Sequence, residues 1–246
     1  MKKIPTLICA SCLLTVALPV FSQESVAPAA PDIAVSARIS TLGYGAELDY
    51  PFNANWNLRV QANSFNYDDT FNESDIDYDG ELDLSTVGAL IDYRPFAGSF
   101  KLTAGLFSNK NNLAASATST TGQVFDIGGA RFSGTTSDPL SLSATVDLGK
   151  STASYLGLGW GNSYSSGISF SFELGALFSG KATAELTASG TAFNIAQPQQ
   201  QFNVQGTSAA AVAFRQELAA EQANLQQDLD DFEIYPVVAL GVGSRF

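Results

Sequence analysis

The strongest pattern along the chain is an alternation of apolar and polar positions. It is most regular in residues 168–178, where one face carries Ile168, Phe170, Phe172, Leu174, Ala176 and Phe178. The positions between them carry Ser169, Ser171, Glu173, Gly175 and Leu177. A period of two residues indicates a β-strand whose two faces meet different environments.

The same alternation predicts further strands over residues 42–50, 58–67, 80–93, 100–107, 155–160 and 235–246. Short turns are expected at residues 51–55, 94–98 and 162–167. Polar composition predicts longer loops at 68–79, 110–145 and 191–206, the second with a small hairpin around 124–132. Within 80–93 the apolar positions change phase near residues 86–88, which predicts a β-bulge because one extra residue exchanges the faces.

Strands that are apolar on one face and small or polar on the other are typical of a membrane β-barrel, whose outer surface meets lipid. Bacterial barrels usually have an even number of strands, so an eighth strand is expected at residues 33–40 or within 112–150. The predicted fold class is all-β: a transmembrane antiparallel up-and-down β-barrel of eight strands, with one amphipathic helix before the last strand.

The helix is predicted at about residues 208–231, which contain no Gly or Pro. Phe214, Leu218, Leu225 and Leu229 recur at helical spacing, and Ser208 is a candidate N-cap. Its other faces are acidic, so the helix is expected outside the bilayer. If the C-terminus is periplasmic, strand counting puts it on the outer side. Packing against its own barrel is favoured over a protein partner docking through 208–231.

The N-terminus predicts an exported chain. Lys2 and Lys3 precede an apolar run from residue 4 to 21, and Ser22 suits cleavage before Gln23. The alternatives are a membrane anchor, which Pro5 and Pro19 disfavour, and a lipoprotein signal at Cys12. The predicted organisation is a cleaved signal peptide at 1–22, a flexible leader at 23–34, and the barrel at 35–246. Both cysteines, Cys9 and Cys12, fall in the signal, so no disulfide is expected.

The last strand alternates toward an aromatic end through Val238, Leu240, Val242 and Phe246. It resembles the terminal strand that outer-membrane barrels present to the barrel-assembly machinery. Segments 41–45, 92–96, 155–161 and 235–238 also resemble a family of small proteobacterial outer-membrane proteins of OmpA, OmpX and OmpW-like architecture. This resemblance implies the outer membrane of a Gram-negative bacterium, with lipid and lipopolysaccharide as surroundings. It implies little about activity.

Charge and composition exclude several functions. The net charge is −12, or −14 once Lys2 and Lys3 are removed, which argues against binding nucleic acid. The chain has no histidine, whereas the known outer-membrane barrel enzymes as families use a catalytic His. Ser–Lys or paired-carboxylate chemistry stays open, but no motif indicates it. The prediction is therefore a non-enzymatic protein without a cofactor.

Two motifs have both functional and structural interpretations. Asp75, Asp77 and Asp79 resemble the start of a calcium-binding loop, but Thr86 occupies the position of the bidentate Glu. These residues are weak candidate ligands for a divalent cation. The alternatives are a solvated loop or the start of an inward-facing acidic ladder through Glu81 and Asp83. Glycine occupies every second position over residues 157–161. We interpret these glycines as leaving room for larger side chains of neighbouring strands inside a narrow barrel.

Charged residues at inward positions are expected to form ion pairs inside the barrel, because an unpaired buried charge is costly. The candidates are Glu47, Arg59, Asp92, Lys101, Glu173 and Arg245, with Lys181 as a further cation. A turn centred on Asn53 would place Glu47 directly opposite Arg59, and Asp92 should pair with Lys101. A paired network predicts a filled lumen and a structural, adhesive or partner-docking role for acidic loops. The alternative is a small channel or a lateral conduit for apolar solutes.

Overall fold

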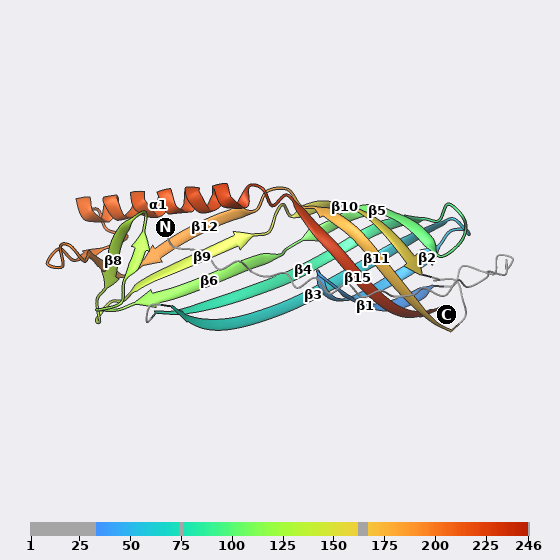
Figure 1. Ribbon diagram of the computed structural model, residues 1–246, viewed down its shortest axis with the longest axis horizontal. Helices are drawn as coiled ribbons and strands as arrows, with labels where there is room; N and C mark the ends of the chain where they lie inside the picture. Colours follow the sequence, from blue (N-terminus) through green and yellow to red (C-terminus); the bar gives the residue numbers. More distant parts are fainter. Residues whose placement is uncertain (1–32, 74–75, 162–166, 246) are drawn as a thin grey trace.

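The computed structural model describes residues 33–73, 76–161 and 167–245. The predicted signal peptide at 1–22, most of the leader, Asp75 and Phe246 lie outside these residues. Eight antiparallel strands close into a barrel, shown at the right of Figure 1. They are β1 (Ala34–Ser40), β2 (Gly43–Pro51), β3 (Trp56–Glu73), β4 (Ile76–Tyr93), β5 (Phe100–Asn109), β10 (Thr152–Gly161), β11 (Ile168–Phe178) and β15 (Ile234–Arg245).

The predicted barrel and its strand number are confirmed. The eighth strand is β1, which pairs with both β2 and β15 and so lies at the first of the two expected positions. Pairing between β4 and β5 and between β5 and β10 completes the circle. Closure leaves no free edge in this part of the sheet, because each barrel strand has a neighbour on both sides.

The alternation of side chains also agrees with the sequence. On β3, Val60 is 46% exposed, whereas Arg59 and Gln61 on the inward face are 0% and 2% exposed. Where the eight strands form the barrel, with β3 counted up to Ser64 and β4 from Thr86 onward, the outward positions that the structure describes carry no charged residue. The outer wall of the barrel is therefore a continuous apolar surface.

Two predictions about β3 and β4 were wrong. Residues 68–73 and 76–79 belong to strands and not to a loop. Both strands have 18 residues, and they pair from Trp56 with Tyr93 to Glu73 with Ile76. This pairing has no bulge. The apparent change of phase arises because Leu84 and Leu90 face inward beside Thr86 and Asp92, so the inner face itself is partly apolar.

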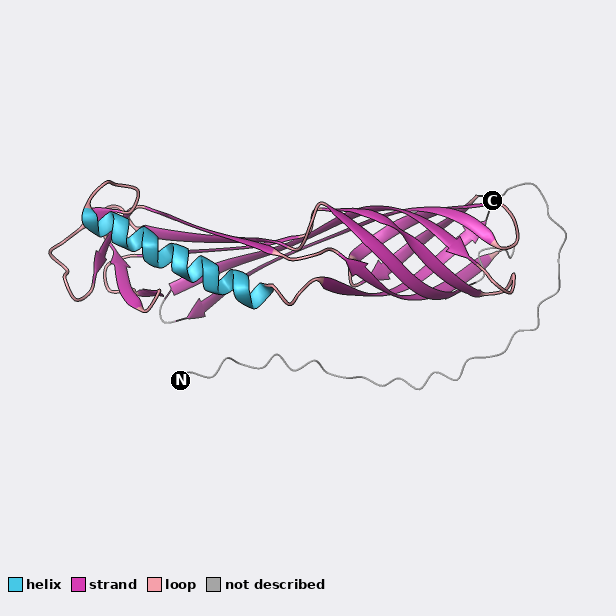
Figure 2. Ribbon diagram, turned by 90° about the horizontal axis from the view of Figure 1, so that it is seen from above, coloured by secondary structure: helices cyan, strands magenta, loops and turns pink. Residues whose placement is uncertain are grey.

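Beyond the barrel, the sheet continues on one side only. Here residues 66–73 of β3 pair with residues 76–83 of β4. Beside β4 the sheet continues with β6 (Asn112–Ser119), β9 (Leu140–Asp147) and β12 (Thr183–Ser189), in that order. We call these five paired segments the extension. Figure 2 shows the extension and the barrel at opposite ends of a long molecule.

A second, smaller sheet lies at the far end of the extension. It consists of β7 (Phe125–Ile127), β8 (Ala130–Gly134), β13 (Thr191–Asn194) and β14 (Phe202–Asn203). Residues 110–145 are therefore largely strands, of which only the small β7–β8 hairpin was predicted, whereas residues 191–206 are mostly turns and bends around the short strands β13 and β14. A strand that exposes Ser, Thr and Asp on one face has a composition that resembles that of a loop.

The helix α1 (Ala209–Leu229) precedes the last strand as predicted, and its N-cap Ser208 accepts a hydrogen bond from the amide of Ala211. Phe214 is fully buried with Phe132 and Phe202 of the small sheet. Leu225 and Leu229 pack on Val146 and Ala184 of the extension. The described part of the chain contains no helix that is long and apolar enough to cross a membrane.

An exposed ion pair joins the end of α1 to the extension, with Lys181 Nζ 2.8 Å from Asp230 Oδ2. The hydrogen bond from Lys181 lowers the pKa of Asp230, and the same hydrogen bond to the Asp230 carboxylate raises the pKa of Lys181. Lys181 therefore belongs to the helix contact and not to the barrel interior, where it had been considered.

Candidate functional site: an inward-facing charge cluster

Arg59 of β3 is the centre of a cluster of charged side chains inside the barrel. Its Nη1 atom lies 3.1 Å from Glu47 Oε2 and 2.8 Å from Glu173 Oε2, and its Nη2 atom lies 3.2 Å from Asp92 Oδ1. The Arg59 side chain is 0% exposed. A guanidinium suits this position because its planar set of five donors can serve several carboxylates at once.

Two further cations complete the cluster. Lys101 Nζ lies 3.2 Å from Asp92 Oδ2 and 3.0 Å from Glu173 Oε2. Arg38 of β1 forms a short ion pair with Glu47. Glu47, Asp92 and Glu173 thus each meet at least two cations, which is the condition for keeping charges away from water.

Neutral groups satisfy the remaining carboxylate oxygens. Thr103 donates to Asp92 Oδ1 at 2.6 Å, and Tyr155 donates to Glu173 Oε1 at 2.6 Å. Asn57 Nδ2 lies 3.0 Å from both Asp49 Oδ1 and Asp92 Oδ2. These contacts join strands β2 to β5 with β10 and β11, so the cluster links most of the barrel wall.

Glycines opposite the long side chains make the cluster fit. Arg38 lies between Gly45 of β2 and Gly241 of β15 in the strand register. A Cβ on Gly159 would lie 2.7 Å from Lys101 Cε. The glycines of the 157–161 motif therefore provide room in a narrow barrel, as the sequence suggested.

An apolar layer lies on the other side of Tyr155, toward the extension. Leu42, Leu90, Phe107, Leu177 and Val237 are all at most 2% exposed there. The turn that carries Leu42 is tied to β15, because the amide of Thr41 donates to the Val238 carbonyl and Tyr235 donates to the Thr41 carbonyl. The interior thus has a charged layer and an apolar layer.

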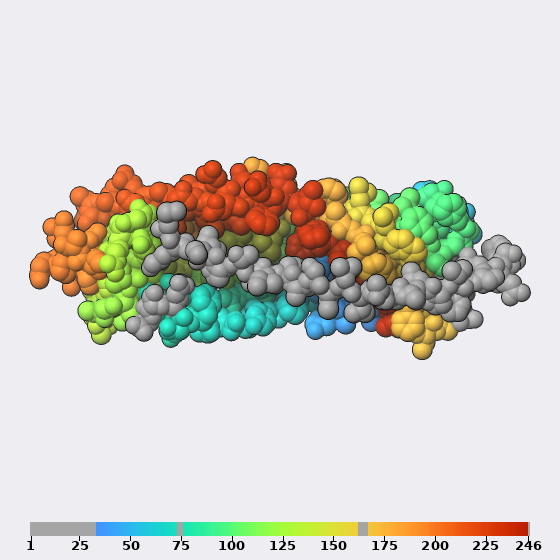
Figure 3. Space-filling view, viewed as in Figure 1, coloured from blue at the N-terminus to red at the C-terminus, as the bar shows by residue number. Residues whose placement is uncertain are grey.

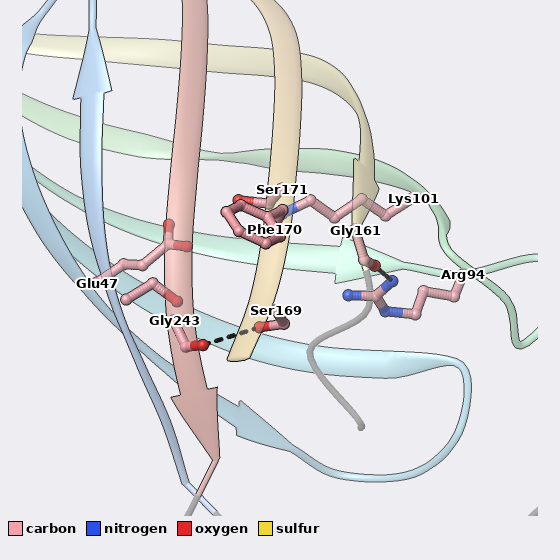
Figure 4. Close-up of a pocket in the computed structure, with 9 residues that line it drawn as sticks. Glu47, Arg94, Lys101, Gly161, Ser169, Phe170, Ser171 and Gly243 are labelled. Carbon is pink, nitrogen blue, oxygen red and sulfur yellow. Dashed lines mark hydrogen bonds between the residues drawn. The ribbon is translucent and has the colours of Figure 1, made fainter. Parts of the chain in front are cut away.

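A space of only about 10 Å³ remains beside the charged layer, toward the turns at the barrel end (Figure 4). It is lined by Ser36, Glu47, Arg94, Lys101, Gly161, Ser169, Phe170, Ser171 and Gly243. Arg94 closes this end by donating to the Gly161 carbonyl at 2.9 Å and to the Gly98 carbonyl at 3.1 Å. Such a space is about the smallest that holds one water molecule.

The structure brings together five of the six predicted inward charges: Glu47, Arg59, Asp92, Lys101 and Glu173. Arg245 lies instead at the end of β15, opposite Ala34. The predicted register of the first hairpin was wrong, because Glu47 faces Gln61 and Asp49 faces Arg59. Arg59 reaches Glu47 diagonally, since its long side chain spans the offset of one residue pair.

Sequence reasoning missed Arg38, Asp49, Asn57 and Tyr155. Asp49 and Asn57 share the inward parity of Glu47 and Arg59, so the alternation alone could have identified them. Arg38 depended on placing the eighth strand at 33–40. Tyr155 lies on β10 among glycine and apolar residues, so the sequence of this strand did not indicate that its hydroxyl would donate to Glu173.

The acidic motif lies far from this cluster. Asp77 and Asp79 are on the exposed face of β4, where they accept hydrogen bonds from Asn72 and Thr70. The ladder through Glu81 and Asp83 exists, but it faces outward and not inward. The described residues contain no group of three or more Asp, Glu, His or Cys side chains arranged for a metal ion, and Asp75 is outside them.

Comparison with known proteins supports the fold. No protein-family model matches the chain, and no curated protein matches it. Among solved structures, Acinetobacter baumannii CarO is similar with a TM-score of 0.52 and 20% identity, over 87% of this chain and 97% of CarO. A. baumannii CarO2 has a TM-score of 0.54 and 19% identity, over 88% of this chain and 99% of its own. The more specific resemblance to the OmpA, OmpX and OmpW-like family stays a prediction. The structural likeness shows that the chain shares its fold with the CarO β-barrels.

Proposed function

We propose that the chain is a non-enzymatic outer-membrane β-barrel protein of a Gram-negative bacterium. In this proposal its lumen is filled, and its extension is a docking platform held outside the membrane. The uncharged, apolar outer wall supports the membrane location. Aromatic side chains near the short turns suit a membrane interface, among them Trp56, Tyr93, Phe100 and Trp160.

The outward face of the β3–β4 hairpin supports a membrane boundary along the strands. On β4, Ile91 and Val87 are 49% and 54% exposed and apolar, whereas Asp83, Glu81 and Asp79 continue the same face into the extension. The apolar residues suit contact with lipid, and the acidic residues suit contact with water. The helix and extension lie at the end opposite the C-terminus (Figure 1), so a periplasmic C-terminus would place them at the cell surface.

The observation that carries the proposal is the charge cluster around Arg59. Its charged side chains are at most 5% exposed and cross the interior from β1 to β11. An eight-stranded barrel is just wide enough for its own side chains. An ion path would require these pairs to separate, and each separated charge would then be buried without a partner.

Ion conductance in a planar lipid bilayer tests the proposal. The purified protein should give no stable current steps, while a large porin inserted in the same way gives them. Arg131→Ala is the matched control for effects of purification and insertion, since Arg131 is exposed on the small sheet and away from the lumen. Stable steps from the unmodified protein would favour the small-channel alternative. Uptake of an apolar dye into vesicles tests the lateral conduit in the same preparation.

A further inference from the structure

The two edges of the extension differ in how they are protected. At the β12 edge, Gln226 Oε1 accepts from the Ala184 amide at 3.1 Å, and Gln222 Oε1 accepts from the Leu186 amide at 3.2 Å. Gln226 Nε2 also donates to the Ala182 carbonyl at 2.8 Å. Side chains of α1 therefore occupy the main-chain groups that another strand would use.

The β3 edge has no such cover among the described residues. Pairing with β2 ends at Ser64, and from residue 66 to 73 β3 pairs only with β4. These eight residues span about 26 Å at about 3.3 Å per residue. They contain neither proline nor a bulge, so a row of main-chain donors and acceptors is open. In Figure 3 the β3–β4 hairpin and α1 form opposite borders of the extension.

The side chains along this edge define what could pair with it. Tyr67 and Phe71 lie on one face and are 54% and 51% exposed. Asp68 lies on the other face, next to Glu81 of β4, and Thr70 lies next to Asp79. Neither residues 66–73 nor residues 76–83 include a Lys or Arg.

We propose that residues 66–73 of β3 bind an extended segment of a partner protein by β-strand addition. The partner segment carries basic side chains at alternate positions, beside Asp68, whose neighbour Glu81 on β4 adds to the negative charge, and apolar or aromatic ones between them, beside Tyr67 and Phe71. Main-chain hydrogen bonds supply the affinity and the alternating side chains supply the specificity. This inference rests on the proposed function, because the extension must be outside the membrane.

A second copy of the chain is a poorer occupant of the same edge. Two β3 edges would meet without a Lys or Arg on either side, and antiparallel pairing centred on Asp69 would place this residue opposite Asp69 of the other copy. Like charges opposite each other destabilise a strand pair. The acidic edge thus selects against self-association and for a basic partner.

Binding of a labelled eight-residue peptide of alternating Lys and Val to the full-length folded protein in micelles tests the proposal. Asp68→Lys should weaken binding at least about tenfold, because it turns an attraction into a repulsion. Glu185→Lys is the matched control: it makes the same charge change on an exposed position of β12, the covered edge. A peptide of alternating Glu and Val should not bind. Equal losses in both variants would overturn the proposal in favour of non-specific attraction.

Main-chain pairing has its own readout. The peptide should slow amide exchange in residues 66–73 and not in β12, and methylation of every second peptide nitrogen on the bonding side should abolish binding. Undiminished binding of the methylated peptide, or protection elsewhere, would overturn strand addition. A protein that conducts no ions yet fails to bind the peptide refutes this inference alone, whereas stable conductance refutes the filled lumen alone.

Discussion

Arg59 Nη1 lies 2.8 Å from Glu173 Oε2, although β3 and β11 are not neighbours in the sheet. The pair crosses the interior, and only closure of the barrel brings the two strands face to face. Both side chains are at most 3% exposed. A contact between non-adjacent strands therefore acts as a cross-brace, and its loss affects several strands at once.

Replacing Arg59 by Ala should destabilise the folded barrel by about 3–5 kcal/mol, because Glu47, Asp92 and Glu173 lose their shared partner. Urea unfolding in detergent micelles, followed by the mobility shift of unheated samples on a gel, measures this change. Arg131→Ala removes an exposed arginine from the small sheet and should change the unfolding midpoint little. Equal midpoints for both variants would show that the cluster contributes nothing to stability.

The barrel was predictable because each strand of a barrel with an apolar outer wall and a polar interior must alternate. On β5, for example, Leu102 and Leu106 could only face outward once Lys101 and Thr103 faced inward, and the structure agrees. The extension was not predictable in the same way. Strands such as β6 and β9 carry Ser and Thr among their exposed positions, and such residues give no signal that distinguishes a strand from a loop.

The charge cluster was predictable in membership but not in geometry. Inward parity identified Glu47, Arg59 and Asp92, since parity survives an error of two residues in register. The exact partners depend on the turn: residues 52–55 separate β2 from β3, which puts Asp49 and not Glu47 opposite Arg59. Contacts across the barrel, such as Arg59 with Glu173, follow from strand order and closure, which alternation does not encode.

Gly159→Ala should lower the free energy of unfolding by about 1–3 kcal/mol, because the new methyl group would lie 2.7 Å from Lys101 Cε and displace a packed ion pair. Gly80→Ala is the matched control, since its nearest neighbour, the carbonyl oxygen of Asp69, would be 3.6 Å away. Unfolding midpoints in urea should separate the two variants. If Gly159→Ala were as stable as Gly80→Ala, the fit around Lys101 would be looser than the structure indicates.

Replacing both Gln222 and Gln226 by Ala should expose the β12 edge while the barrel stays folded. The amides of Ala184 and Leu186 each lose a side-chain acceptor, so their hydrogen exchange should become about fivefold faster, since each lost bond is worth about 1 kcal/mol. Mass spectrometry of exchanged peptides over residues 183–189 measures this. Gln227→Ala, on the exposed side of α1, should leave exchange there unchanged; an equal increase would implicate general loosening of the helix.

Two positions on the same face of β3 test where the membrane ends. Val60 lies on the apolar outer wall and is 46% exposed, whereas Thr70 lies ten residues further along, in the extension. Val60→Lys should cost about 2–4 kcal/mol of folding stability in lipid vesicles, because the charge enters the hydrocarbon region. Thr70→Lys should change stability by about 0.5 kcal/mol or less, as expected for a residue in water. Both changes add one positive charge to an exposed position of the same strand, so membrane depth is the main difference between them. Comparable effects of the two substitutions would place the bilayer elsewhere on the molecule, and with it the boundary between barrel and extension proposed above.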